Sequence, residues 1–282
     1  MASLVWRYYV LQDTIYFIVY KCLRYRVGVV TENLRNSFPD RPMAEIKRIR
    51  RSFYHNLSEI FISTVSQAAM SDDDCRRRVR VKNLDEVLSD LRGRDALLST
   101  AHFGCWEYDS FLALYTGEHY LAAVYHPLEN KVIDAVYMRL RRRRNIRLIP
   151  MKEIIRYYID HRLPAGAPGQ RIGIGLIADQ NPPLRPNSHW FRFLNQDTVF
   201  FDGIEKMALK FHMPVYFCRQ RRLRRGYYEL EFLRLYDGVE QVAPNEVTER
   251  YVRQLESDIV ADPGMWLWSH RRWKHRRPQC PS

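Results

Sequence analysis

Blocks of apolar residues recur along the chain with two different spacings, and the two spacings alternate. Five short runs have the branched or alternating composition of strands: Ala96–Ala101, Leu121–Tyr125, Ile172–Ala178, Pro214–Cys218 and Tyr228–Leu235. Segments with helical spacing lie between them: Trp106–Tyr115, Asn130–Arg143, Glu153–His161 and Gly203–Phe211. This alternation predicts an α/β fold with a mixed, mostly parallel sheet flanked by helices, and a site at the carboxyl ends of the strands.

The residues before the first predicted strand are expected to be helical. Apolar positions from Ile46 to Val65 recur at helical spacing, which predicts a long amphipathic helix. Ser71 is followed by three aspartates, a pattern typical of a helix start. Leu84–Leu91 predicts one more helix before the sheet begins.

Residues 1–30 have a different character and precede a single predicted domain of residues 31–282. Arg7, Asp13 and Lys21 interrupt the apolar run well short of the ~20 residues that a spanning helix needs. Aromatic rings mixed with cations are typical of a helix that lies at a membrane surface. We therefore predict a helical membrane-associating segment, with an ordinary helix packed on the core as the alternative.

Charge and cysteine content narrow the class of protein. The chain of 282 residues is 46% hydrophobic, enough for a large core, and 45 Lys and Arg against 32 Asp and Glu give a net charge of +13. The expected partners are therefore anionic: nucleic acid, a phospholipid surface or an acidic protein. Five scattered cysteines without C-x-x-C spacing argue against a disulfide framework and a zinc site.

The strongest candidate for chemistry is the run from His102 to Glu107, directly after the first predicted strand. A neutral imidazole can take a proton from a hydroxyl, and a carboxylate can fix its tautomer. On one regular helix the two side chains would point about 140° apart, so they need a break, which Gly104 permits. Because no serine nucleophile accompanies the pair, the activated hydroxyl should belong to the substrate.

Cys105 suggests a different mechanism. A cysteine three positions from His102 invites a Cys–His nucleophile with an acyl-cysteine intermediate. Against this, buried cysteines are usually inert in packing.

Several motifs occur together in a characteristic order. The string His102-Phe103-Gly104-Cys105-Trp106-Glu107 resembles the His-x4-Asp/Glu box of glycerolipid and lipid A acyltransferases. Three further stretches and an arginine-rich run leading into Leu148-Ile149-Pro150 follow the same family pattern, namely Asn33–Pro39, Ile177–Pro182 and Trp266–Lys274. From about Tyr16 onward the chain is therefore similar to the lipid A biosynthesis (lauroyl/myristoyl) acyltransferases, with a glycerol-3-phosphate acyltransferase-like fold.

This resemblance implies a role for several residues. It makes His102 the general base and Glu107 its partner, while Arg141 or the backbone amide of Gly104 would bind the oxyanion or a phosphate. Five of the residues 139–144 are arginines, so a solvated basic face explains most of that run equally well. The resemblance also places substrate-binding residues at two polar clusters: Asp179, Gln180 and Asn181, and Gln196 with Asp197. A plain turn before Pro182 is the alternative for the first cluster.

The implied function is transfer of a fatty acyl chain from acyl carrier protein, or from coenzyme A, to a hydroxyl of a lipid A precursor or related membrane lipid. It would take place at the cytoplasmic face of a bacterial inner membrane and would need no metal or organic cofactor. Two alternatives stay open: a basic nucleic-acid-binding protein with a structural His–Glu pair, and a thioesterase that uses the same pair on water. The sequence lacks helix-turn-helix, zinc-finger and RNP signatures, which argues against nucleic acid.

Overall fold

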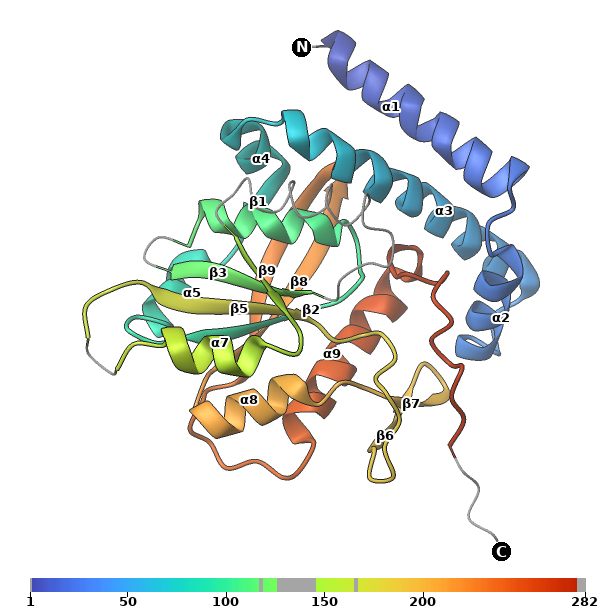
Figure 1. Ribbon diagram of the computed structural model, residues 1–282. Helices are drawn as coiled ribbons and strands as arrows, with labels where there is room; N and C mark the ends of the chain where they lie inside the picture. The colour runs from blue at the N-terminus through green and yellow to red at the C-terminus, as the bar shows by residue number, and fades with distance from the viewer. Residues whose placement is uncertain (1, 117–118, 126–145, 165–166, 278–282) are drawn as a thin grey trace, which may run out of the picture.

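A seven-stranded sheet forms the centre of the computed structural model, which describes residues 2–116, 119–125, 146–164 and 167–277 (Figure 1). The strand order is β1-β9-β8-β2-β5-β3-β4, and neighbouring strands are parallel except in the antiparallel β8–β9 hairpin. The strands are β1 (Val79–Val81), β2 (Ala96–Thr100), β3 (His119–Tyr125), β4 (Arg147–Pro150), β5 (Arg171–Ile177), β8 (Val215–Arg224) and β9 (Tyr227–Tyr236). The predicted mixed, mostly parallel sheet flanked by helices is confirmed.

All five predicted strands are present, and the strands that the pattern does not predict are the shortest. β1 and β4 have three and four residues, too few to display an alternation. The separate hairpin of β6 (Trp190–Phe193) and β7 (Gln196–Val199) is equally short. In contrast, β8 and β9 are ten residues each and extend beyond the predicted ends.

The helices follow the predictions with two differences. They are α3 (Met43–Ser66), α4 (Asp72–Arg78), α5 (Leu84–Asp90), α7 (Ile154–His161), α8 (Gly203–Phe211) and α9 (Glu246–Ala261). Ser71 caps α4 through a reciprocal capping box with Asp74, as its sequence indicates. The segment Trp106–Leu114 is a 3₁₀ helix rather than an α-helix, and α9 is not predicted. The predicted helix over 130–143 lies outside the described residues.

The N-terminal helices pack on the rest of the protein. α1 (Ala2–Tyr16) lies alongside α3, and a π-helical stretch (Phe17–Cys22) leads to α2 (Val27–Ser37) (Figure 1). Tyr16 stacks on His55 of α3 with ring centroids 3.7 Å apart. Within the described part of the chain, no helix is long and apolar enough to cross a membrane. Part of the aromatic content of residues 1–30 therefore serves packing, which the sequence analysis held open as an alternative.

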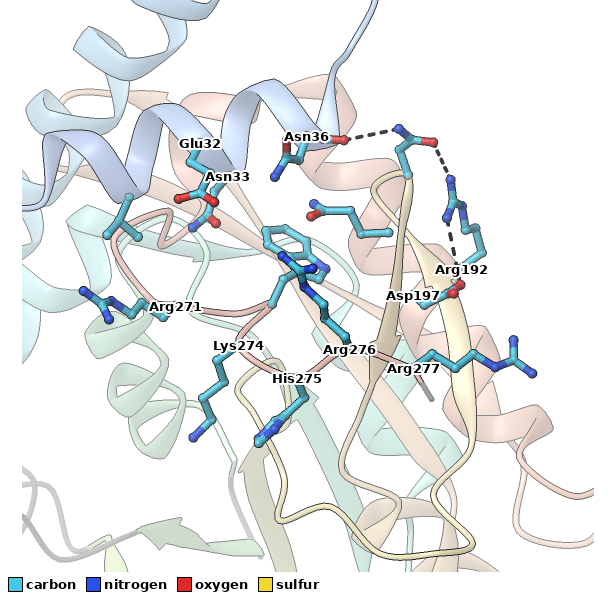
Figure 2. Close-up of a pocket in the computed structure, with 14 residues that line it drawn as sticks. Glu32, Asn33, Asn36, Arg192, Asp197, Arg271, Lys274, His275, Arg276 and Arg277 are labelled. Atoms are coloured by element: carbon cyan, nitrogen blue, oxygen red, sulfur yellow. Dashed lines mark hydrogen bonds and ion pairs between the residues drawn. The ribbon is translucent and has the colours of Figure 1, made fainter. Parts of the chain in front are cut away.

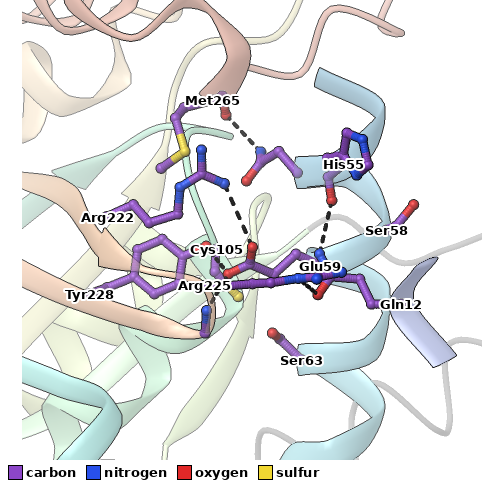
Figure 3. Close-up of polar contacts among 12 residues, drawn as sticks. Gln12, His55, Ser58, Glu59, Ser63, Cys105, Arg222, Arg225, Tyr228 and Met265 are labelled. Carbon is purple, nitrogen blue, oxygen red and sulfur yellow. Dashed lines mark hydrogen bonds and ion pairs between the residues drawn. The ribbon is translucent and has the colours of Figure 1, made fainter. Parts of the chain in front are cut away.

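A buried carboxylate joins α3 to the β8–β9 hairpin (Figure 3). Glu59 is 1% exposed and accepts hydrogen bonds from the Gly226 backbone at 2.6 Å and the Tyr228 hydroxyl at 2.7 Å. Arg222 completes an ion pair with it at 3.6 Å. Removing one partner of such a buried pair typically costs about 3–5 kcal/mol, because the other charge is left uncompensated. Glu59 thus fixes α3 against the sheet.

A second contact joins α3 to the turn after β2. The Met265 carbonyl accepts from the Asn56 side chain at 3.1 Å and from the Gly104 backbone at 2.9 Å. Both lone pairs of this carbonyl are therefore engaged. The turn that carries His102 is in this way linked to the helical layer.

Candidate active site

His102 and Asp179 meet because their strands are neighbours in register. Each lies two residues beyond the paired strand ends Thr100 and Ile177 of parallel β2 and β5. The carboxyl ends of parallel strands share one edge of a sheet, and side chains that follow them gather there. His102 Nδ1 lies 2.7 Å from Asp179 Oδ1, and the His102 backbone N–H donates to Asp179 Oδ2 at 3.0 Å.

Asp179 is a fully partnered buried carboxylate. Its side chain is 2% exposed, and the Trp266 indole N–H donates to Oδ2 at 2.8 Å. Burial by itself would raise the pKa of Asp179, but the adjacent His102 and the three hydrogen bonds hold it below its usual value. An ionised Asp179 accepts a hydrogen bond from the Nδ1–H of His102, so the lone pair of the neutral imidazole is on Nε2.

The Nε2 side of the imidazole faces two polar or aromatic neighbours. The Gln180 side-chain Nε2 is 3.3 Å from His102 Nε2, close enough to donate to its lone pair. Trp106 presents its ring edge-on to the imidazole, with centroids 5.0 Å apart. The His102 side chain is 18% exposed, so this side can be reached by a substrate.

Glu107 occupies a different place from the one that its spacing suggests. It lies in the first turn of the 3₁₀ helix and accepts from the Trp106 indole at 3.2 Å. The hydrogen bonds described at the imidazole go to Asp179 and Gln180, and Glu107 is not among these partners. The carboxylate on Nδ1 in the structure is therefore Asp179, while Glu107 supports the aromatic neighbour of His102.

The backbone amide of Gly104, predicted as an oxyanion donor, already donates to the Met265 carbonyl. Gly104 has φ +63°, and a Cβ there would lie 2.1 Å from Gln220 Oε1. Glycine is needed for both reasons, so its role in the structure is to shape the turn. Arg141, the other predicted oxyanion residue, lies outside the described residues.

Cys105 does not have the environment of a nucleophile. It is fully buried, and burial raises the pKa of its thiol well above the usual value. A thiol that stays protonated is unreactive. Its backbone N–H donates to Gln220 Oε1 on β8, and Gln220 Nε2 donates to its carbonyl at 3.2 Å.

A small apolar cavity adjoins Trp106. It has a volume of about 110 Å³ and is lined mainly by apolar residues of β2, β3 and β5. Asp109 also lines it and accepts from Thr100 at 2.7 Å and Gln220 at 3.2 Å. Burial raises the pKa of Asp109 to about 7, and the nearby charge of Glu107 acts in the same direction.

A wide groove with an excess of cations is lined in part by Arg271, whose carbonyl accepts a hydrogen bond from Asn181 (Figure 2). It has a volume of about 900 Å³ and runs between α2, the β6–β7 hairpin and the C-terminal segment. Among the described residues, no ion pair involves four exposed cations of this segment: Arg271, Lys274, Arg276 and Arg277. The groove therefore presents unneutralised positive charge.

Of the predicted substrate-binding residues, Asp179 and Gln180 lie at the imidazole, and the other three lie at this groove or its margin. Gln196 and Asp197 line it, with Asp197 3.9 Å from Arg192. Asn181 lies at its margin, where its side chain donates to the Arg271 carbonyl and accepts from Arg272, both at 2.8 Å. The structure thus connects the two polar clusters, which are 15 residues apart in the sequence, through the C-terminal segment.

Two residues of the C-terminal segment, the buried Arg272 and the half-buried His270, escaped the sequence analysis as parts of the site. Arg272 is 3% exposed, and burial lowers its pKa to about 10, while Asp179 acts in the opposite direction. Burial and the charge of Arg272 lower the pKa of His270 to about 4, so this imidazole is neutral at neutral pH. The signal for both was their place in the Trp266–Lys274 motif.

Trp266 and Trp268 are buried, with 2% and 0% exposure. Indoles packed in the core cannot stack on bases, so these two tryptophans cannot form a stacking surface for single-stranded nucleic acid. Within the described chain, no group of three or more His, Cys, Asp or Glu side chains could hold a metal ion.

Comparison with known proteins supports one family. Among curated proteins, no sequence matches this chain. The profile of the bacterial lipid A biosynthesis acyltransferases, in contrast, matches residues 15–275, nearly the full length. The resemblance seen in the motifs is confirmed, and the chain belongs to the bacterial lipid A biosynthesis acyltransferase family.

Proposed function

We propose that this acyltransferase moves a fatty acyl chain from a thioester donor to a hydroxyl of a lipid A precursor or related membrane lipid. Membership of the family implies an acyltransferase. The observation that carries the specific proposal is the His102–Asp179 pair, which has an apolar cavity beside its neighbour Trp106 and a cationic groove beside Asn181. An acyl chain and an anionic headgroup require those two surroundings.

In the proposed reaction, His102 Nε2 takes the proton of the acceptor hydroxyl as that oxygen attacks the thioester carbonyl. Asp179 keeps the proton on Nδ1 and stabilises the imidazolium that forms. Glu107 contributes by holding Trp106 beside the imidazole. When the intermediate collapses, the leaving thiolate takes the proton from Nε2.

The cationic groove is the proposed site of the acceptor headgroup. Its exposed cations suit phosphate groups, and the side-chain amides of Asn36 and Gln196 suit sugar hydroxyls (Figure 2). The donor is proposed to be acyl carrier protein or, alternatively, acyl-coenzyme A, both of which are anionic.

The proposed location is the cytoplasmic face of a bacterial inner membrane. Residues 1–30 support attachment to the membrane surface, because Phe17 and Leu23 are 59% and 69% exposed beside Lys21 and Arg24. Exposed rings and aliphatic groups next to cations suit the interface of an anionic bilayer.

The test follows a radiolabelled acyl chain from acyl carrier protein to a tetra-acylated lipid A precursor in detergent. We expect label on the lipid with the wild-type protein, at least about 10³-fold slower transfer with His102→Ala, and unchanged transfer with the surface control His161→Ala. Release of free fatty acid without labelled lipid would instead identify a thioesterase. Full activity of His102→Ala would exclude the mechanism.

A further inference from the structure

The tetrahedral intermediate of acyl transfer carries a negative oxygen that needs a hydrogen-bond donor. Such donors are commonly backbone N–H groups next to the catalytic residue. In this protein the N–H groups of residues 102–105 are all engaged. Their acceptors are Asp179 Oδ2 for His102, the Ala101 carbonyl for Phe103, the Met265 carbonyl for Gly104 and Gln220 Oε1 for Cys105. None of these four backbone N–H groups is therefore left to bind the oxyanion.

The side-chain amide of Gln180 is the described donor nearest to the basic nitrogen. Its Nε2 lies 3.3 Å from His102 Nε2, and no other side-chain hydrogen bond of Gln180 is formed within the described residues. One N–H therefore faces the position that the acceptor hydroxyl must take in order to reach His102. The other N–H has no protein partner in that region.

Gln180 is also held between two anchored neighbours. Asp179 is fixed by His102 and Trp266, and Asn181 is fixed by Arg272 and the Arg271 carbonyl. The backbone on both sides of Gln180 is thus restrained, and its side chain contacts the imidazole. A donor on a rigid support stabilises developing charge with little reorganisation.

We propose that Gln180 is a catalytic residue whose side-chain amide donates a hydrogen bond to the oxyanion of the tetrahedral intermediate. This inference rests on the proposed acyl transfer. In the resting protein the amide covers the Nε2 lone pair, and the incoming hydroxyl displaces it by about one hydrogen-bond length.

The hydroxyl proton moves to His102 Nε2, the new C–O bond forms, and the carbonyl π pair moves to the oxygen that Gln180 Nε2 contacts. Collapse restores the C=O bond and breaks the C–S bond. The thiolate then leaves with the proton from Nε2, so neither an oxidant nor a further reactant is needed.

Gln180→Leu tests the proposal, since leucine keeps similar volume and removes the donor. We expect kcat to fall about 10²–10³-fold, the loss found on removing one oxyanion donor in other enzymes, with KM for donor and acceptor changed less than threefold. Gln180→Glu, which replaces the donor with an acceptor, should be at least as slow. Gln254→Leu on α9, a glutamine whose amide binds Asp258 and makes no contact with the imidazole, is the control and should match the wild-type kcat.

Two further measurements separate oxyanion binding from a structural role. A phosphonate analogue of the tetrahedral intermediate should bind Gln180→Leu more weakly by the same factor as the loss in kcat/KM. The downfield proton signal of His102 Nδ1–H, assigned by its absence in His102→Ala, should remain. A variant that keeps more than one third of wild-type kcat, a loss confined to KM, or disappearance of that proton signal would overturn the role. Absence of transfer by the wild type would overturn the proposed function together with this inference.

Discussion

The two sides of the His102 ring differ in how completely their polar groups are satisfied. On the Nδ1 side, Asp179 is buried and accepts from three protein donors. On the Nε2 side, the only described hydrogen-bond contact of the ring is one long contact to Gln180. The groove beside Asn181 carries four cations that form no ion pair in the described chain. The satisfied side defines the geometry of the base, and the unsatisfied side is available for substrate.

The largest effect on kcat is expected from removing the charge of Asp179 on the Nδ1 side of the ring. Asp179→Asn keeps the shape but loses the charge that holds the proton on Nδ1, so kcat should fall about 10³–10⁴-fold. Glu107→Gln, which retains an acceptor for the Trp106 indole, should cause a smaller loss. The transfer rates of both variants at saturating substrate show which of the two carboxylates orients the His102 imidazole. A larger loss for Glu107→Gln would return the orienting role to the carboxylate that the sequence spacing suggests.

A second prediction concerns the buried carboxylate beside the apolar cavity. The pKa of Asp109 rises on folding from 3.8 to about 7, so the folded state binds more protons between these values and its stability falls as pH increases. Asp109→Asn lacks this titration. The free energy of unfolding of the variant relative to wild type should therefore increase by about 3 kcal/mol from pH 5 to pH 8.

Urea denaturation at the two pH values measures that difference. Asp160→Asn, an exposed carboxylate on α7, is the control and should show little change with pH. A constant difference between Asp109→Asn and wild type across this range would mean that Asp109 is already ionised at pH 5.

The smallest effect is expected in the groove. Replacing Lys274 and Arg276 with glutamate should raise the KM for a phosphorylated acceptor about tenfold, or about 1.4 kcal/mol, and leave kcat largely unchanged. The effect should shrink at high salt. Lys210→Glu on α8 is the matched control for each single variant, Lys274→Glu or Arg276→Glu. It changes the net charge by the same amount as either one and lies on a different element. Equal effects of the groove and control variants at equal net charge would show that only overall charge matters.

The fold was largely predictable because long elements carry repeated signals. The five predicted strands and the helix α3 each have enough apolar positions to reveal their spacing. The short strands β1 and β4 do not. α9 did carry a signal, with buried Val247, Tyr251, Leu255 and Ile259 at every fourth position.

The site was predictable in its position but not in its pairing. Both His102 and Asp179 follow predicted strands, so their placement at one sheet edge could be anticipated. Which carboxylate reaches the imidazole depends on β2 and β5 being neighbours in register, a long-range property that local spacing does not encode. The engagement of the Gly104 amide by Met265 is equally non-local, because 161 residues separate them.

The shared carbonyl of Met265 has a consequence for motion. It holds the Gly104 amide and the Asn56 side chain together, and Glu59, three residues further along α3, is bound to the β8–β9 hairpin. The Gly104 amide proton can exchange with solvent only when this junction opens. We expect it to exchange as slowly as the central strands, which would make the catalytic turn part of the last cooperative unit to unfold and not a surface loop that fluctuates independently.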